Sequence, residues 1–313
     1  MSSAVKPLQG VYAASLTPLK PDGRPDLGAL VAHCRWLMAN GCDGVAPLGT
    51  TGEANSLALD DRLEVIAACG AGLPADRLLI GTGASAVGDA AKLTRAALAA
   101  GTSHVLALPP FYYKGPSEDG LFAFYSSLIE TVGDSRLKVY LYHIPPQSAV
   151  PITHGLINRL IKRYPTTVVG LKDSSGDWQH TEGLCKAFPG FATFAGTEEL
   201  LLPTLQAGGA GCISATANVT CRLAREVFDV AKAGGDAGPK QAAMTKVRLA
   251  FQAYPLIAGL KAMMARATGD QGWNRLAPPN MPLSPAQAEA LAARLAELAF
   301  TIPDYPRLSS AAE

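Results

Sequence analysis

The sequence predicts an α/β protein, and within that class a (β/α)8 TIM barrel with a C-terminal helical extension. Three observations predict this fold. Short apolar runs alternate with longer amphipathic stretches along most of the chain. Eight such runs occur, and a chain that alternates strands with helices forms a parallel sheet that can close into a barrel. The length of 313 residues suits one barrel of about 250 residues plus an extension.

The strands are predicted where the apolar runs are short. They cover residues 11–16, 44–47, 78–81, 104–108, 138–142, 168–172, 191–195 and 211–214. The main alternative is an open doubly wound sheet, which would have about five or six strands and a G-x-G-x-x-G turn after the first one. The first run here leads into Thr17-Pro18-Leu19, which contains no such turn. We therefore favour the closed barrel.

The helices are predicted from the amphipathic stretches. They cover residues 27–39, 60–71, 87–99, 118–132, 153–164 and 181–187, and in the extension 240–253, 256–267 and 284–299. Glycines at positions 208, 209, 211, 234 and 235 are interpreted as turns, and residues 277–282 as a proline-rich break. We expect two parts, a barrel over residues 1–233 and a helical extension over residues 234–313 that packs on it.

Composition limits the classes of partner. Hydrophobic residues make up 48% of the chain, and 27 basic and 26 acidic residues give a net charge of +1 without a charge run. We expect no nucleic acid and no membrane as a partner. The six cysteines form no C-x-x-C pair and predict buried apolar positions rather than a metal site. The first ten residues contain no apolar signal core, so we expect a cytoplasmic protein.

Lys172 closes the sixth apolar run, within residues 171–177 (LKDSSGD). At the mouth of a barrel this side chain would be held out of water, which disfavours the ammonium and favours the nucleophilic neutral amine. The alternative is a surface lysine paired with Asp173.

Residues 48–53 (LGTTGE) directly follow the second strand. Two glycines allow a tight turn whose N–H groups can bind a carboxylate or a phosphate. The motif is not a P-loop, because the G-K-[ST] ending is missing. The alternative is an ordinary helix N-cap with Glu53 in its first turn.

Two aromatic segments complete the set of candidate groups. Tyr142, in residues 139–145 (VYLYHIP), can pass protons to a bound molecule, or be a core tyrosine. Residues 109–116 (PPFYYKGP) form an aromatic loop, which is alternatively a lid or a subunit contact. All four groups lie at the C-terminal ends of strands two, four, five and six, at the barrel face that carries active sites in this architecture. The sequence therefore predicts an active site there.

With these motifs, the sequence resembles the superfamily of dihydrodipicolinate synthase and N-acetylneuraminate lyase, which are pyruvate-dependent class I aldolases. The motifs G-T-T-G-E, Y-x-x-P and G-x-K-D occur in this order, and the resemblance runs from about Gly10 to the C-terminal helices. It implies a lyase that forms a Schiff base with pyruvate or a 2-keto-3-deoxy acid and breaks a carbon–carbon or carbon–oxygen bond. It also implies that no cofactor is needed and that the chain forms a homotetramer of tight dimers.

The resemblance implies roles for individual residues. Lys172 matches the Schiff-base lysine, and Tyr142 matches the tyrosine that shuttles protons. Thr50 and Thr51 match the pair that binds the pyruvate carboxylate, in a turn bounded by Gly49 and Gly52. Thr51 is also expected to hydrogen-bond Tyr142.

Further positions match residues of the pocket. Tyr113 matches a tyrosine that reaches into the site of a neighbouring subunit and completes a proton relay, and Ile213 matches a residue that lines the pyruvate pocket. The candidate specificity residues are Gln147, Ser174, Gly196, Glu198 and Glu199.

The chain departs from the named members of the superfamily at several positions. Gln147 stands where the synthase of lysine biosynthesis has an arginine, and a neutral amide cannot replace a guanidinium–carboxylate pair. Ala215 stands where the sialic-acid lyases have a serine, Ser174 where they have a threonine, and His143 follows the catalytic tyrosine in place of an asparagine. We expect a shorter substrate such as a 2-keto-3-deoxy sugar acid, with 4-hydroxy-tetrahydrodipicolinate synthase and N-acetylneuraminate lyase as alternatives.

Two other classes of protein stay open. A phosphate-binding barrel isomerase could use the turns at residues 208–211 and would not need Lys172. A non-catalytic binder of keto acids would not need the proton relay of Tyr142, Thr51 and Tyr113.

Overall fold

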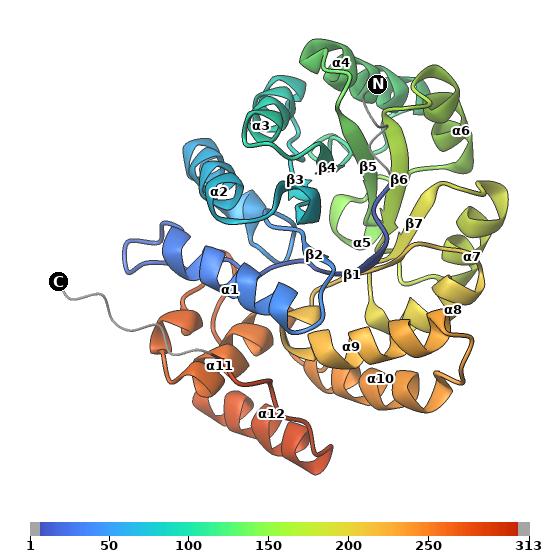
Figure 1. Ribbon diagram of the computed structural model, residues 1–313. Helices are drawn as coiled ribbons and strands as arrows, with labels where there is room; N and C mark the ends of the chain where they lie inside the picture. Colours follow the sequence, from blue (N-terminus) through green and yellow to red (C-terminus); the bar gives the residue numbers. More distant parts are fainter. Residues whose placement is uncertain (1–6, 306–313) are drawn as a thin grey trace.

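The computed structural model describes residues 7–305, and these form a parallel barrel surrounded by helices (Figure 1). The eight strands are hydrogen-bonded in the order β2-β1-β8-β7-β6-β5-β4-β3. A parallel bridge between Val45 and Leu78 connects the two ends of this order and closes the ring. The predicted fold class is confirmed.

All eight predicted strands are present, although β2 and β3 are only two residues long. The strands are β1 (Gly10–Ala13), β2 (Gly44–Val45), β3 (Ile80–Gly81), β4 (His104–Ala107), β5 (Lys138–His143), β6 (Val168–Asp173), β7 (Ala192–Ala195) and β8 (Gly211–Ser214).

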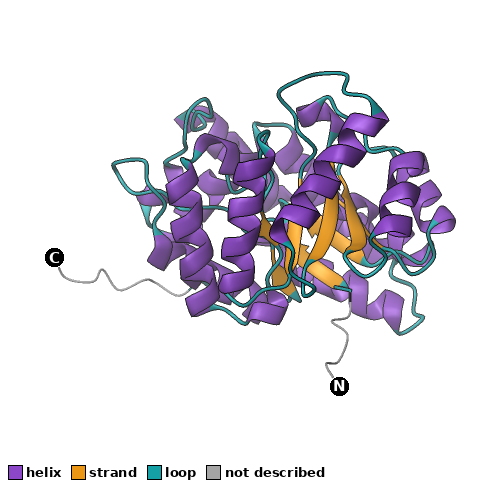
Figure 2. Cartoon of the chain, turned by 90° about the horizontal axis from the view of Figure 1, so that it is seen from above, coloured by secondary structure: helices purple, strands orange, loops and turns teal. Residues whose placement is uncertain are grey.

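Helices follow the strands and lie outside the sheet (Figures 1 and 2). They are α1 (Leu27–Ala39), α2 (Leu59–Gly72), α3 (Val87–Ala99), α4 (Glu118–Val132), α6 (His154–Arg163), α7 (Trp178–Ala187), α8 (Leu201–Gln206) and α9 (Ala217–Lys232), with a one-turn helix α5 (Pro145–Ser148) after β5. The six predicted barrel helices are confirmed to within three residues at each end, and α8 and α9 complete the pattern. None of the helices among residues 7–305 is long and apolar enough to cross a bilayer.

Successive side chains of each strand point alternately into and out of the barrel, and they form two separate cores. Side chains that point inward fill the barrel, where the rings of Tyr12 and Tyr140 pack on Phe194 with centroids 5.8 and 6.1 Å apart. Side chains that point outward form a larger core with the helices. Side chains of residues 7–305 therefore fill the barrel below its mouth, and the carboxyl ends of the strands are the expected place for a small molecule to bind.

The C-terminal extension consists of α10 (Gly238–Gln252), α11 (Leu256–Thr268) and α12 (Pro285–Glu297), close to the predicted ranges. It packs beside α1 and α9 (Figure 1). Leu16 and Val219 of the barrel share a buried cluster with Phe251, Leu260 and Met264 of the extension. The predicted division at residue 233 stays a prediction.

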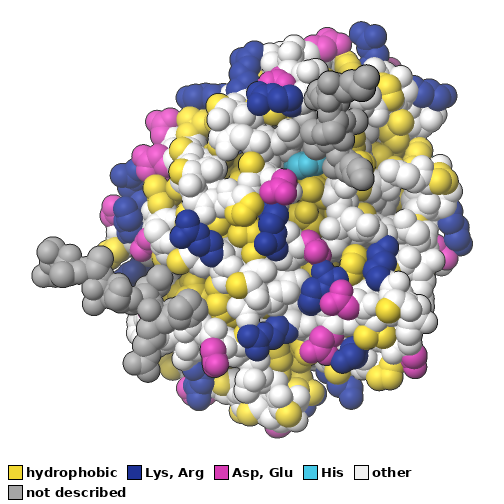
Figure 3. All heavy atoms as spheres, viewed as in Figure 1, with side chains coloured by type: hydrophobic (Ala, Val, Ile, Leu, Met, Phe, Trp, Pro, Cys, Tyr) yellow, Lys and Arg dark blue, Asp and Glu magenta, His cyan; other side chains and the backbone are white. Residues whose placement is uncertain are grey.

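The visible face of the molecule carries charges of both signs, and the cysteine thiols are buried. Figure 3 shows basic and acidic side chains interspersed over the face seen in Figure 1. All six cysteines are buried and unpaired, as the sequence predicts. Their thiols lie away from solvent, and burial raises the pKa of Cys221 to about 11.

Candidate active site

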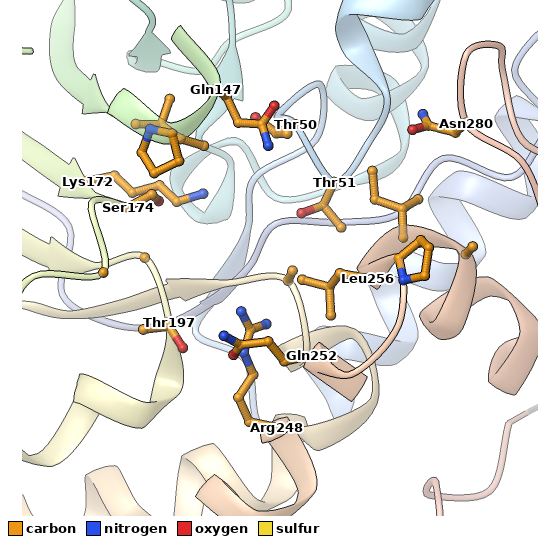
Figure 4. Close-up of a pocket in the computed structure, with 18 of the residues that line it drawn as sticks. Thr50, Thr51, Gln147, Lys172, Ser174, Thr197, Arg248, Gln252, Leu256 and Asn280 are labelled. Atoms are coloured by element: carbon orange, nitrogen blue, oxygen red, sulfur yellow. The ribbon is translucent and has the colours of Figure 1, made fainter. Parts of the chain in front are cut away.

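A cavity of about 680 Å³ lies at the carboxyl ends of the strands (Figure 4). Its wall contains eight of the predicted site residues. These are Thr50, Thr51, Tyr142, Gln147, Lys172, Ser174, Gly196 and Glu199. The structure therefore brings together residues that the sequence spreads over almost 150 positions.

Lys172 and Tyr142 face each other across adjacent strands. The parallel register of β5 and β6 places the Cα atoms of Tyr142 and Lys172 side by side. The Lys172 Nζ donates to the Tyr142 hydroxyl at 3.1 Å, and the lysine is only 3% exposed. Within residues 7–305, no carboxylate lies at ion-pair distance from this amine. The alternative of a surface lysine paired with Asp173 is therefore wrong.

Asp173 points to the outer side of β6 because adjacent strand residues face opposite ways. Its Oδ2 accepts from His180 Nδ1 at 2.8 Å and from the Thr181 hydroxyl at 2.7 Å, and its Oδ1 accepts from the Ser175 N–H at 2.9 Å. Burial alone would raise the pKa of Asp173, but these hydrogen bonds lower it below its usual value. The bond to Asp173 raises the pKa of His180. This pair fixes the turn that carries Ser174.

His143, Asp173 and His180 lie close enough to raise the question of a metal ion, with one ligand atom of each within 4.8 Å of the others. The His143 Nδ1 accepts from the Ile152 N–H at 3.0 Å, and burial lowers the pKa of His143 to about 4. Three protein donors already bind the Asp173 carboxylate, and the Ile152 N–H binds the His143 Nδ1. We interpret this cluster as a hydrogen-bond network.

Tyr142 is placed to exchange protons. Burial alone would raise the pKa of its phenol, but the charge of Lys172 and hydrogen bonds from neighbouring side chains outweigh burial and lower it. One neighbour is Thr50, whose Oγ1 lies 3.3 Å from the Tyr142 hydroxyl. The predicted contact of Tyr142 with Thr51 is therefore wrong. Successive residues of a turn project in different directions, and Thr50 is the one that points toward the tyrosine.

The threonine turn has an unusual backbone. Leu48 and Glu53, on either side of it, adopt left-handed conformations with φ of 59° and 57°. For residues other than glycine this costs about 1–2 kcal/mol each, so surrounding contacts must hold the turn. Gly49 and Gly52 do not line the cavity, which departs from their predicted role. A Cβ at Gly52 would lie 3.0 Å from the Ser15 carbonyl oxygen, so this glycine permits close backbone packing.

Gly196 has a similar packing role, although it does line the cavity. A Cβ at this position would lie 2.1 Å from the Ser174 Oγ and 2.6 Å from the Asp173 carbonyl oxygen. The Gly196 N–H also donates to that carbonyl at 2.6 Å. The glycine thus lets the ends of β6 and β7 stay together.

Two predicted substrate-binding residues do not reach the cavity. Glu198 is fully buried, and its carboxylate accepts from the hydroxyls of Ser214 and Thr220, the latter at 2.8 Å. Its oxygens are satisfied by the fold, and the next residue, Glu199, lines the cavity instead. Ile213 is buried in the barrel interior beside Tyr142, below the cavity. The prediction for Glu198 is wrong, and Ile213 belongs to the buried cluster inside the barrel rather than to the cavity wall.

Tyr113 lies in the loop between β4 and α4 and is 79% exposed. It does not line the cavity of the single chain. Its role at a neighbouring subunit stays a prediction.

The extension supplies a wall that the sequence analysis did not identify. Arg248 and Gln252 point into the cavity from α10, and Leu256 and Asn280 line it nearby (Figure 4). The Arg248 Nη1 donates to the Thr216 hydroxyl at 3.3 Å, and its buried Nε has no hydrogen-bond partner among residues 7–305. The spacing of four residues puts Arg248 and Gln252 on one helix face, but no sequence pattern indicated where that face points.

Comparison with known proteins gave consistent matches over nearly the whole chain. The model of the Dihydrodipicolinate synthetase family matches residues 7–298. An uncharacterized DapA-like lyase of Chloroflexus aurantiacus is 37% identical over 287 residues, which is 91% of this chain and 95% of the relative. The 4-hydroxy-tetrahydrodipicolinate synthase of Agrobacterium fabrum is 32% identical over 92% of this chain and 97% of its own.

Solved structures agree with these matches. The crystal structure of dihydrodipicolinate synthase from Agrobacterium tumefaciens has a TM-score of 0.82 at 32% identity, over 92% of this chain and 99% of that one. A variant of the Sulfolobus solfataricus 2-keto-3-deoxygluconate aldolase has a TM-score of 0.83 at 20% identity, over 93% of this chain and 96% of that one, which is a likeness of fold.

Proposed function

The chain belongs to the dihydrodipicolinate synthetase family, and from this premise we propose that it is a lyase whose Lys172 forms a Schiff base with pyruvate or a related 2-keto acid. One observation carries the proposal. The Lys172 amine is buried, has no carboxylate partner within residues 7–305, and lies 3.1 Å from the Tyr142 hydroxyl in the cavity that Thr50 and Thr51 also line.

The proposed first stage is imine formation. The neutral Lys172 amine attacks the keto carbon, and the resulting carbinolamine loses water to give an iminium. Tyr142, whose hydroxyl lies 3.1 Å from the Lys172 Nζ, is proposed to supply a proton to the departing hydroxyl and to recover one afterwards. The N–H groups and hydroxyls of Thr50 and Thr51 hold the carboxylate, which fixes the keto carbon within reach of the amine.

The second stage uses the iminium as an electron sink. In the cleavage direction, the C4 hydroxyl of a 2-keto-3-deoxy acid gives its proton to the Tyr142 phenolate while the electrons of the C3–C4 bond move to the iminium, so that an aldehyde leaves and an enamine remains. Protonation at C3 and hydrolysis then release pyruvate and restore Lys172. In the other direction, loss of a C3 proton from bound pyruvate gives the enamine that attacks an aldehyde. Tyr142 is proposed as the group that exchanges the protons in these steps.

The wall opposite Lys172 supports a polar second substrate. Arg248, Gln252 and Glu199 offer a cation, an amide and a carboxylate to the outer part of the cavity. Such groups suit the hydroxyls and the acid group of a 2-keto-3-deoxy sugar acid. The neutral Gln147 does not favour 4-hydroxy-tetrahydrodipicolinate synthase, although relatives carry that name.

Tyr113 is proposed to act in an assembly. Its 79% exposure, next to the exposed Tyr112, suits a contact with another copy of the chain. We propose a homotetramer in which Tyr113 extends the proton relay of the neighbouring subunit.

The test is reductive trapping. Incubation with pyruvate and borohydride should add one reduced pyruvate to the peptide that contains Lys172, and Lys172→Ala should lose it. A wild-type enzyme that gives no adduct would overturn the proposal and would favour a phosphate-binding isomerase. Pyruvate release should then be measured with keto-deoxy sugar acids and sialic acid, and condensation with aspartate semialdehyde. Release from keto-deoxy sugar acids is expected, and a preference for aspartate semialdehyde would overturn the substrate assignment.

A further inference from the structure

A second lysine lies behind the threonine turn, and no step of the proposed mechanism uses it. Lys261 of α11 is completely buried, and its Nζ donates to the carboxylate of Glu53 and, at 2.7 Å, to the Arg275 carbonyl oxygen. Glu53 is the last residue of the G-T-T-G-E motif, and its side chain is also completely buried. A buried ion pair is costly to dehydrate, so its position next to the site calls for an explanation.

Glu53 is held from several sides. Besides Lys261, its carboxylate accepts from the Ala277 N–H at 2.8 Å and from the Asn280 amide at 3.4 Å. Its own N–H donates to the Thr50 carbonyl oxygen at 3.0 Å, which ties it directly to the turn. These bonds hold Glu53 in the left-handed conformation that ends the turn.

The negative charge of Glu53 gives a second reason why Lys261 is needed, besides holding the turn in place. The turn has a cavity side, where Thr50 and Thr51 line the wall, and a rear side, where Glu53 is buried. A substrate carboxylate on the cavity side would be repelled by an uncompensated carboxylate behind the same turn, because buried charges are poorly screened. Lys261 neutralises that carboxylate from the side away from the cavity.

We propose that Lys261 is a positioning residue that makes the threonine turn able to bind an anion, by holding and neutralising Glu53. The inference rests on the proposed function, since it assigns the carboxylate of the 2-keto acid to Thr50 and Thr51. Lys261 itself touches no substrate. Its effect is therefore on the preference for a charged over an uncharged keto compound.

The test compares pyruvate with methyl pyruvate, which has the same keto group and no charge. For each, the concentration that gives half-maximal trapping on Lys172 is measured with cyanoborohydride, which reduces the iminium in preference to the free ketone.

Lys261→Met should lower the preference for pyruvate over methyl pyruvate by about tenfold, because it leaves Glu53 uncompensated. Glu53→Gln keeps the shape of the side chain and removes the negative charge, so the preference should stay equal or rise. The double variant, which has neither charge, should return to within about threefold of the wild type.

Lys138→Met is the matched control. Lys138 is buried at the amino end of β5, where its Nζ donates to the Thr166 carbonyl oxygen at 2.6 Å, on the opposite side of the barrel from the cavity. This variant should lower the thermal stability and leave the preference unchanged. General damage to the fold cannot lower the preference in one variant and preserve it in the other.

Several outcomes would overturn the inference. They are an unchanged preference in folded Lys261→Met, a lowered preference in Glu53→Gln, or an equal loss in Lys138→Met. If Lys261→Met does not fold, the inference is tested by whether Glu53→Gln raises or lowers the preference for pyruvate over methyl pyruvate. A wild-type protein without any adduct on Lys172 would instead contradict the proposed function, so the two failures are distinguishable.

Discussion

Tyr142 shows how a single side chain depends on its exact surroundings for its chemistry. Tyr140, two residues earlier on the same strand, also points into the barrel, but burial there raises the pKa of its phenol and its hydroxyl accepts from the Leu8 N–H. The pKa of Tyr142 is lowered because Lys172 and Thr50 lie beside its hydroxyl. The pKa values of two tyrosines on one strand are thus shifted in opposite directions.

Tyr142→Phe should lower turnover by about a hundredfold, because it removes the group that donates and accepts protons. Trapping of pyruvate on Lys172 should stay detectable, since the amine remains in place. Both quantities can be measured by pyruvate release and by mass spectrometry. Tyr140→Phe is the control and should cost stability with little change in turnover; equal losses in the two variants would contradict the role of Tyr142.

His180→Gln should show a pH-dependent loss of stability. The raised pKa of His180 means that its contribution is complete below about pH 6.5, the unfolded value, and disappears as the pH rises through the folded pKa. The lowered pKa of Asp173 means that its contribution is present above pH 3.8 and disappears as the pH falls through the folded pKa. The difference in unfolding free energy from the wild type should therefore be largest near pH 5, about 1 kcal/mol.

Denaturant unfolding at pH 5 and at pH 9 measures this difference. Gln179→Ala, at the exposed position of α7 next to His180, removes no titratable group, so it is the control and should show no such trend. A larger loss for His180→Gln at pH 9 than at pH 5 would contradict the assigned pair.

At the scale of elements, the close packing of the ends of β6 and β7 depends on Gly196, because a glycine has no side chain. The Gly196 N–H donates to the Asp173 carbonyl oxygen, and Ser174 lies directly against the glycine. The next element, the short helix from Glu198 to Leu200, then turns Glu198 inward and Glu199 toward the cavity. One packed glycine therefore sets the positions of residues from two strands.

Gly196→Ala should lower both the melting temperature and the rate of imine formation, because its Cβ would overlap the Ser174 Oγ and the Asp173 backbone. A loss of about 1–3 kcal/mol is expected from such overpacking. Gly88→Ala in α3 is the control, since a Cβ there meets nothing within 4 Å, and it should leave stability equal or up to about 1 kcal/mol higher. Thermal melts and trapping rates measure both; a Gly196→Ala protein with wild-type values would show that the loop moves aside freely.

The sequence predicted the elements well but not all side-chain directions. The barrel helices and strands follow from periodicity, which the burial of one face imposes on every repeat. Periodicity does not give the direction of a side chain in a tight turn, so the contact of Thr50 was assigned to Thr51, and Glu198 was expected in the site together with Glu199 although only Glu199 reaches the cavity. Arg248 was missed for another reason. Its helix is far from the barrel strands in sequence, and only tertiary packing turns it toward the cavity.

For the whole molecule, the extension and the barrel depend on each other. Barrel residues such as Leu16 and Val219 are buried against α10 and α11, and the Lys261–Glu53 pair joins α11 to the threonine turn. The cavity also takes part of its wall from the extension. The division at residue 233 is therefore proposed as a boundary of topology rather than of folding.

A chain truncated after residue 233 should not unfold cooperatively. Removal of the extension would expose the apolar side chains that it covers and leave Glu53 without its partner. Binding of a fluorescent hydrophobic dye and loss of near-ultraviolet circular dichroism are the expected signs. A cooperative transition at the melting temperature of the full chain would contradict this dependence.

The wall formed by α10 has a consequence for how such an enzyme can diversify. The imine chemistry is fixed to strand ends, whereas Arg248 and Gln252 belong to a helix added after the barrel is complete. With the site residues as proposed above, we expect substitutions at these two helix positions to change which aldehyde is accepted and to leave Lys172 and Tyr142 in place. Laboratory evolution of new substrate ranges would best begin with a library at positions 248 and 252.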